Sequence, residues 1–167
     1  MDGVNLDTLL LWSDTEGHEI RIETLLIAAR SANVGDLLNA HWQEVANYKD
    51  KVPLAPRWES YETFERDGNL LLLTVRENEE LIGYGLFIKR LHLNYESLLV
   101  GENNLIFLRE DKRQSHLGSR LIDLSEAALK AAGVNKITFH TKPEHDFGPM
   151  LKRKGYTLEE HIWGKLL

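Results

Sequence analysis

The residues best suited to chemistry lie between Arg109 and Ile122, where an apolar run leads into a short basic loop and the start of a helix. The first turn of a helix has unpaired backbone N–H groups and carries about half a positive charge, so it favours a bound anion. Gly118 would let a phosphate approach the backbone closely. The nearby side-chain donors are Arg113, Ser115, His116 and Ser119. The segment therefore predicts a pyrophosphate site, although a helix with a solvated basic first turn would have the same composition.

Two strand-like segments flank this helix. Residues 105–108 are continuously apolar, the apolar side chains of a helix over 117–132 fall on one stripe, and strand periodicity resumes over 134–140. A strand, a helix and a second strand form a βαβ unit, whose strands lie parallel.

The other elements are expected around this unit. The pattern predicts a strand over 19–26, helices over 34–48 and 58–66, a hairpin from 70–75 and 81–88, a helix over 146–154, and one or two strands over 156–166. Residues 1–18 have little pattern and are expected to be an N-terminal extension of a single domain spanning 1–167.

The composition is that of a soluble globular protein. The chain has 167 residues, of which 43% are hydrophobic and 28% charged. It contains no cysteine, which excludes disulfides, thiol nucleophiles and thiolate zinc sites. The first residues are acidic where a secretory signal needs basic ones, and no apolar run reaches the length of a membrane span. We therefore expect a cytoplasmic protein without a membrane partner.

Charge is distributed unevenly along the chain. The net charge is −6, and nine of the 26 acidic residues but three of the 20 basic ones lie in the first fifty positions. The remainder is balanced and contains two short basic stretches, 109–120 and 142–154. Small basic stretches suit a compact anionic ligand, so a nucleic-acid partner is not expected.

Residues 109–122 resemble the coenzyme A loop of the GNAT superfamily of acyltransferases. The family pattern is Arg or Gln, two variable residues, Gly, one variable residue, then Gly or Ala. The six places are filled by Arg113, Gln114, Ser115, His116, Leu117 and Gly118. His116 stands where the family usually has its first glycine. The order of elements over 19–167 also resembles the family's order, and the chain is most similar to the small stand-alone acetyltransferase-like proteins common in phage genomes.

The resemblance implies an α/β (α+β) fold, with a mixed, largely antiparallel sheet of about six to seven strands flanked by about four helices. It also implies acetyl coenzyme A as cosubstrate and a backbone oxyanion donor at Leu108 or Arg109. The residues implied for binding the cosubstrate are Phe107, Leu108, Arg109, Arg113, Gln114, Ser115, His116, Leu117, Gly118, Ser119, Glu144 and Phe147. The tyrosine that many members use as general acid is replaced by Leu151, and Glu144 stands where many have an asparagine.

Candidates for the catalytic base come from several parts of the chain. They are His140, Glu102, His92 with Tyr95, and Glu44 beside His41 and Trp42. Histidine suits proton transfer because its ordinary pKa is near neutral pH, although a single histidine is often a structural residue. His145 lies near the expected cosubstrate groove. No metal is expected, because none of these histidines shows the helical i, i+4 spacing of zinc proteases.

The leading hypothesis is an N-acetyltransferase that moves an acetyl group to a primary amine by direct attack. The alternative is a coenzyme A-binding or protein-binding regulatory module without turnover, which the departures at His116 and Leu151 favour. The acidic N-terminal part, with Asp36 and Glu44, would either attract a cationic acceptor or only keep the protein soluble. The apolar end around Trp163 suggests either a homodimer formed through the last strand or an edge strand covered by the chain's own extension.

Overall fold

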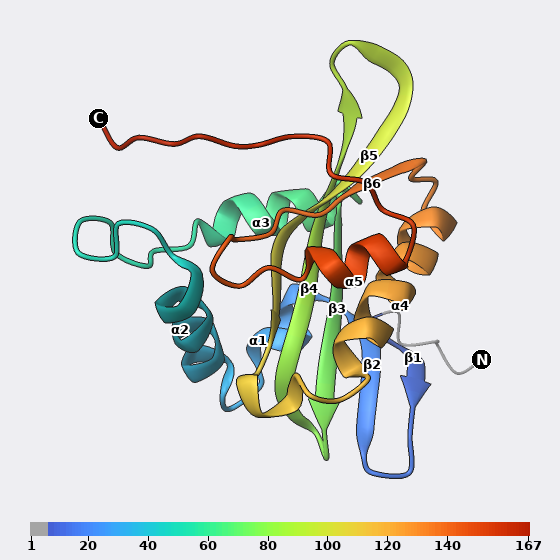
Figure 1. The fold of residues 1–167 in the computed structure, drawn as a ribbon. Helices are drawn as coiled ribbons and strands as arrows, with labels where there is room; N and C mark the ends of the chain where they lie inside the picture. Colours follow the sequence, from blue (N-terminus) through green and yellow to red (C-terminus); the bar gives the residue numbers. More distant parts are fainter. Residues whose placement is uncertain (1–6) are drawn as a thin grey trace.

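One six-stranded sheet forms the centre of the computed structural model, which describes residues 7–167 (Figure 1). Its strands lie in chain order: β1 (Thr8–Ser13), β2 (His18–Glu23), β3 (Leu70–Glu77), β4 (Glu80–His92), β5 (Tyr95–Leu108) and β6 (Lys136–Thr138). Neighbours from β1 to β5 are antiparallel, and β5 and β6 are parallel. The parallel pair and the helix between its strands confirm the predicted βαβ unit.

Helices cover both faces of the sheet (Figure 1). One face carries α1 (Leu25–Ala29), α2 (Val34–Val45) and α3 (Trp58–Arg66), and the other carries α4 (Leu117–Ala131) and α5 (Gly148–Arg153). A 3₁₀ turn, η1 (Glu110–Lys112), connects β5 to α4. No helix within residues 7–167 combines the length and apolar character that a membrane crossing requires.

The sheet has a hydrophobic core on each face, and successive residues of the central strands point alternately into one core and the other. Leu73 of β3 packs with Leu117 and Leu121 of α4, whereas its neighbour Leu72 packs with Leu37 of α2 on the opposite face. Because side chains of a strand point alternately to its two faces, a strand covered on both sides is continuously apolar. This explains the long apolar runs of β3 and β4.

Several predicted elements are confirmed. Helix α3 has the expected bounds, and α4 ends one residue earlier than expected. The hairpin between β3 and β4 turns at Asn78 and Glu79, which both have positive φ angles (47° and 72°). Such a turn matches the twist of the strands that it joins.

Other expectations are corrected. The expected extension contains β1, which pairs with β2 at the sheet edge. Strand β5 begins at Tyr95 and not at Leu105. Strand β6 has only three residues, and no strand forms over 156–166. The last residues instead run away from the domain with their apolar side chains exposed (Figure 1).

Strands β5 and β6 separate soon after they pair. Their register ends at Glu102↔Thr138, and beyond it the Asn103 side chain replaces strand pairing. Its Oδ1 accepts the backbone N–H of His140 (2.5 Å), and its Nδ2 donates to the His140 carbonyl (3.3 Å). The next residue, Asn104, is an extra residue in β5 opposite the step from Leu86 to Phe87 in β4. A bulge at this point bends β5 away from β6.

Candidate functional site

A cavity of about 1680 Å³ lies where β5 and β6 separate. Helices α1, α2 and α3 form one side of it. The second half of β5, the first turn of α4 and residues of the 140–153 segment form the other. It therefore combines the predicted anion-binding helix start with the exposed edge of a strand.

The first turn of α4 is suited to an anion. Gly118 and Ser119 line the cavity, and first-turn N–H groups have no partner within their own helix. A Cβ placed on Gly118 would lie 3.8 Å from the Leu108 side chain, its nearest neighbour, so the space above the helix start is open. The cationic side chains lining the cavity are Arg113, Lys142 and Arg153. These donors and charges fit the pyrophosphate of a coenzyme A molecule.

The backbone of β5 presents polar groups to the gap. The Arg109 N–H donates to the Ile82 carbonyl of β4 (2.9 Å), so Arg109 cannot supply the oxyanion donor. Because backbone groups alternate along a strand, those of Leu108 and Ile106 point the other way, toward the gap. In agreement, the Leu108 carbonyl accepts the Arg113 Nε–H (2.8 Å). Of the two implied positions, only Leu108 has its N–H on the gap side.

Three residues far apart in sequence meet at the cavity wall. The Glu44 carboxylate, at the end of α2, accepts from Nη2 of Arg113 (2.7 Å) through one oxygen. Its other oxygen lies 3.3 Å from Nδ1 of His145. Arg113 also lies over the Phe107 ring, with Cζ 5.3 Å from the ring centroid. Glu44 thus connects α2, the predicted coenzyme A loop and the segment before α5.

A second histidine and carboxylate lie at the point where the strands separate. Nε2 of His140 lies 3.9 Å from Oε1 of Glu102, whose other oxygen accepts from Arg90 (2.9 Å). Both His140 and Glu102 line the cavity. Nearby, the Tyr61 hydroxyl of α3 donates to Oδ1 of Asn104 (2.7 Å), which joins α3 to the β5 bulge. The structure brings together His140 and Glu102, which the sequence analysis named as separate candidates for the base.

His41, unlike His140 and His145, is buried. It is 7% exposed, its Nδ1 lies 2.7 Å from the Tyr84 hydroxyl, and its ring stacks on Phe107. Burial lowers the pKa of His41 to about 4 and raises the pKa of Tyr84. Because both groups are neutral at pH 7, they form an uncharged part of the cavity wall.

His92 and Tyr95 lie elsewhere. Their rings pack in a tilted arrangement at the tip of the long β4–β5 hairpin, with centroids 4.7 Å apart (Figure 1). Neither residue lines the cavity. Their proximity in sequence reflects the hairpin turn, so this geometry gives them no contact with the reacting groups.

The residues implied for cosubstrate binding divide into two sets. The set that lines the cavity is Phe107, Leu108, Arg113, Ser115, Gly118, Ser119, Glu144 and Phe147. The set that does not is Arg109, Gln114, His116 and Leu117. His116 packs edge-on against Trp12 (5.4 Å between centroids), with Nε2 4.0 Å from Asp14. It adopts ordinary right-handed backbone angles (φ −74°, ψ −6°), so this position does not require the glycine usual in the family.

The position implied for the general acid holds no proton donor. Leu151 is 7% exposed and does not line the cavity.

One group within residues 7–167 has the spacing of metal ligands, namely Asp14, Glu16 and His18. Both ring nitrogens of His18 are already engaged, Nδ1 with Asp14 (2.9 Å) and Nε2 with Glu77 (3.0 Å). The ring therefore has no free nitrogen to offer an ion. Sequence reasoning did not identify this cluster, whose members lie close together in the β1–β2 turn and at the start of β2. Only Glu77, the second partner of His18, comes from a strand distant in sequence, β3.

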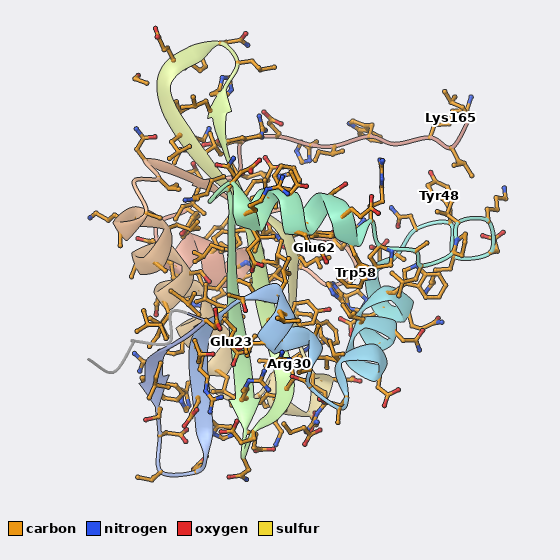
Figure 2. The ribbon with its side chains drawn as sticks, turned by 180° about the vertical axis from the view of Figure 1, so that it is seen from behind. Glu23, Arg30, Tyr48, Trp58, Glu62 and Lys165 are labelled. Atoms are coloured by element: carbon orange, nitrogen blue, oxygen red, sulfur yellow. The ribbon has the colours of Figure 1, made fainter. Side chains whose placement is uncertain are left out.

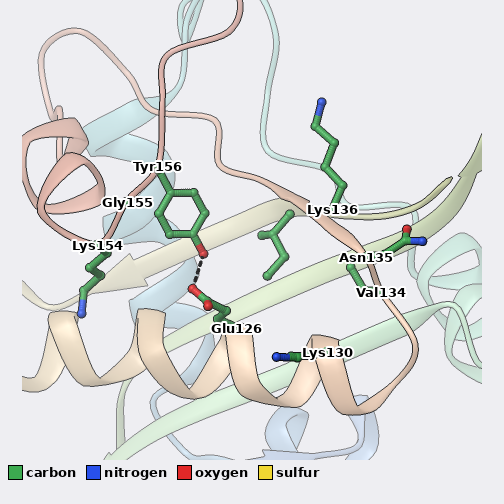
Figure 3. A pocket seen from close by; sticks show the side chains of 9 residues that line it. Glu126, Lys130, Val134, Asn135, Lys136, Lys154, Gly155 and Tyr156 are labelled. Carbon is green, nitrogen blue, oxygen red and sulfur yellow. Dashed lines mark hydrogen bonds between the residues drawn. The ribbon is translucent and has the colours of Figure 1, made fainter.

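A smaller cavity of about 470 Å³ lies between α4, β6 and the residues after α5 (Figure 3). Lys130, Lys136 and Lys154 line it, and the Tyr156 hydroxyl donates to Glu126 of α4 (2.8 Å). It lies beside the open edge of β6.

The sequence matches the family model described as "Acetyltransferase (GNAT) family" over residues 35–147. No curated protein matches it.

Solved structures show the same fold at low sequence identity. An aminoglycoside acetyltransferase from an uncultured soil metagenomic sample aligns with a TM-score of 0.66 and 14% identity, over 90% of this chain and 97% of its own. Glucosamine-6-phosphate N-acetyltransferase from Arabidopsis thaliana aligns with a TM-score of 0.66 and 13% identity, over 89% of this chain and 97% of its own. A transcriptional regulator from Bacillus halodurans C-125 aligns with a TM-score of 0.68 and 16% identity, over 89% of this chain and 98% of its own.

Proposed function

The chain belongs to the acetyltransferase (GNAT) family, and we propose that it transfers an acetyl group from acetyl coenzyme A to a primary amine by direct attack. One observation carries the proposal: the open edge of β5 and the first turn of α4 line the same cavity. A pyrophosphate at the helix start and a thioester along the strand would then be held by one continuous surface. The acetyl thioester, when bound, supplies the activated acyl group.

Individual residues are proposed for distinct tasks. The N–H groups of Gly118 and Ser119 would bind phosphate oxygens, and the Leu108 N–H would donate to the acyl oxygen. His140, close to Glu102 at the strand separation, is the proposed base that removes a proton from the amine. The absence of cysteine fits direct transfer, because no thiol of the chain can hold the acyl group in between.

Isothermal titration with acetyl coenzyme A tests the binding step. Gly118→Asp places a carboxylate at the anion site, whereas Gly35→Asp places one in the first turn of α2, where a Cβ meets nothing within 4 Å. Both substitutions suit a helix start, so folding should be preserved in each. We expect Gly118→Asp alone to weaken binding, and an absence of heat from the unaltered protein at millimolar ligand would overturn the proposal.

A binding or regulatory module without turnover is the second candidate, favoured by the missing acid at Leu151. Release of free thiol in the presence of any amine from a broad panel would exclude it. Nucleic acid is not a proposed partner. The resemblance to phage proteins and the cytoplasmic location stay predictions from the sequence.

The acceptor is proposed to be a cationic amine, and α3 is the helix that would meet it. Figure 2 shows Trp58 and Glu62 on this helix, and both line the cavity with Tyr61. Glu44 is a weaker candidate than the sequence suggested, because Arg113 already pairs with one of its oxygens and His145 lies against the other. Asp36 does not line the cavity.

The test of this acceptor class compares Glu62→Gln with Glu59→Gln, which removes an exposed charge of α3 outside the cavity. One structural neighbour is named as an aminoglycoside acetyltransferase, so an aminoglycoside is a suitable first acceptor. At low salt, Glu62→Gln should raise the KM for the acceptor and Glu59→Gln should not. Equal KM values in both variants would argue against a cationic acceptor at α3.

A homodimer through the C-terminal segment is also proposed. Leu158, Ile162 and Trp163 are 71%, 75% and 93% exposed, and Figure 2 shows Lys165 far from the sheet. The β6 edge offers a second copy's segment a strand to pair with, and Lys130 of the cavity in Figure 3 offers a cation to its glutamates. Lys136 and Lys154 already pair with Glu159 and Asp123 of their own chain. Light scattering should give a dimer for the full chain and a monomer after removal of residues 158–167. A full chain that is monomeric at high concentration would contradict this assembly.

A further inference from the structure

The geometry around Glu44 points to a proton donor that the family pattern does not supply. We propose that His145 protonates the departing sulfur, held in place by Glu44, which Arg113 fixes in turn. The inference rests on the proposed acetyl transfer and adds a catalytic residue to it.

The contacts place His145 in the required arrangement. Glu44 faces its Nδ1 at 3.3 Å, so a proton on Nδ1 is favoured there and Nε2 is directed away from the pair. Arg113 binds the other oxygen of Glu44 (2.7 Å) and is itself anchored on the Leu108 carbonyl (2.8 Å). Glu44 therefore orients His145, and Arg113 orients Glu44. Arg113 is in turn fixed to β5, the strand along which the thioester is expected to bind. Glu44 and Arg113 act on His145 and are positioning residues.

Charged groups around His145 come from four segments. Glu44 belongs to α2, Arg113 to the loop before α4, and Arg153 to α5, which lines the same cavity. In its own segment, Lys142 forms a backbone bridge with His145. The flanking acids are Glu144, which lines the cavity, and Asp146, which accepts the Gly148 N–H (2.7 Å). The nearest carboxylate to the ring is that of Glu44, 3.3 Å from Nδ1.

Three other hydroxyl groups that line the cavity already have hydrogen-bond partners. The Tyr61 hydroxyl donates to Asn104, and the Tyr84 hydroxyl is bound to His41 in a buried pair. The Ser115 hydroxyl donates to the Lys112 carbonyl (2.6 Å). His140 is assigned to the amine. Among these cavity residues His145 combines a carboxylate partner on one nitrogen with the other nitrogen available.

Every proton and electron pair in the proposed step is accounted for. The amine nitrogen forms its bond to the acyl carbon, and His140 takes the proton that the nitrogen must lose. The carbon–sulfur bond breaks with its electron pair going to sulfur, and His145 gives its Nε2 proton to that sulfur. The products are an amide and a free thiol, and solvent returns the proton from His140 to His145.

A leaving-group test separates this role from others. His145→Gln should lower kcat/KM for acetyl coenzyme A by roughly 10²-fold, the low end of general acid catalysis. With the acetyl thioester of a more acidic arylthiol, which leaves without a proton, the loss should nearly disappear. His161→Gln, at an exposed position outside the cavity, is the matched control and should behave as the unaltered protein with both donors.

A second readout does not depend on turnover. In ¹⁵N NMR of the protein alone at pH 7, the His145 Nδ1 should carry a proton, and Glu44→Gln should change this pattern. A protein that releases no thiol overturns the proposed function and this role with it. An active protein whose His145→Gln loss is the same for both donors, or whose Nδ1 signal ignores Glu44→Gln, overturns the role of His145 alone.

Discussion

His18 connects three strands through two carboxylates, and its charge state can be tested directly. The ring is 7% exposed, with Asp14 on Nδ1 (2.9 Å) and Glu77 on Nε2 (3.0 Å). A neutral imidazole has only one N–H, so it can donate to only one of two carboxylates. Both contacts are satisfied only by the imidazolium form. Glu77 also accepts from Lys112 of η1 (2.7 Å), which connects the cluster to the predicted coenzyme A loop.

The direction of the pH dependence follows from the pKa shifts. Burial opposes the charged ring, but the hydrogen bonds and charges of Asp14 and Glu77 raise the pKa of His18 overall. The His18 contribution to stability is therefore complete below its ordinary pKa of about 6.5 and is lost as pH rises through the raised value. The bond from Lys112 and then those from His18 lower the pKa of Glu77, so the carboxylate's contribution is lost as pH falls through that lowered value. The cluster is strongest in mildly acidic solution.

His18→Gln should destabilise the protein by about 3 kcal/mol near pH 6. Hydrogen bonds to charged groups contribute about 1.5–3 kcal/mol each, and glutamine retains part of one of them. For a chain of this size, the loss corresponds to a melting temperature lower by about 6–12 °C. The difference should become smaller as pH rises through the raised pKa of His18, because the unaltered ring then loses its second proton.

Urea unfolding at pH values from 5 to 9 measures this difference. His161→Gln, in the exposed C-terminal segment, is the control and should follow the unaltered protein at every pH. If the difference in free energy of unfolding between the unaltered protein and His18→Gln stays constant from pH 6 to pH 9, the ring does not titrate in this range and the reasoning fails.

Three further substitutions test the fold around the site. Arg76→Met leaves Glu23, whose side chain is fully buried, with only the longer contact to Arg21 (3.7 Å), and should lower the free energy of unfolding in urea by about 3–5 kcal/mol. A neutral result would mean that Arg21 alone is a sufficient partner for Glu23. Gly83→Ala brings a Cβ to 2.8 Å from a carbonyl oxygen of β5 and should cost about 1–3 kcal/mol by the same measurement, unless the two strands can move apart freely. Asn103→Ala removes both hydrogen bonds to the His140 backbone. The fall in kcat/KM for acetyl transfer, expressed as a free energy, should exceed the loss in the free energy of unfolding. Equal losses would mean that Asn103 contributes to stability alone.

Periodicity predicted most of the elements that are covered on both sides or amphipathic. Helix α4 lies where its apolar stripe placed it, α3 lies at its expected position, and β3 and β4 form the expected hairpin. These elements are recognisable because burial on defined faces imposes a spacing on the sequence.

The missed elements lack such a spacing. Strand β1 lies at the edge of the sheet with Leu9 and Leu10 about half exposed, so no alternation marks it. The part of β5 that precedes Leu105 contains Gly101, Glu102 and two asparagines, which are poor strand formers. Its pairing with β4 is decided by the neighbouring strands and not by its own composition. The C-terminal segment has strand-like composition but no strand beside it in this chain.

The site shows the same division between local and tertiary signals. The helix start at Gly118 was predictable because a strand, a basic loop and a helix follow each other in sequence. The Arg113–Glu44–His145 contacts were not, because α2 must fold across the sheet before its last turn reaches the loop. Arg113 matched the family motif and suggested a phosphate contact, yet its guanidinium is bound to the Leu108 carbonyl and to Glu44. A motif specifies which residue is present, whereas the contacts of that residue in the folded chain decide whether it binds a ligand or holds another side chain in place.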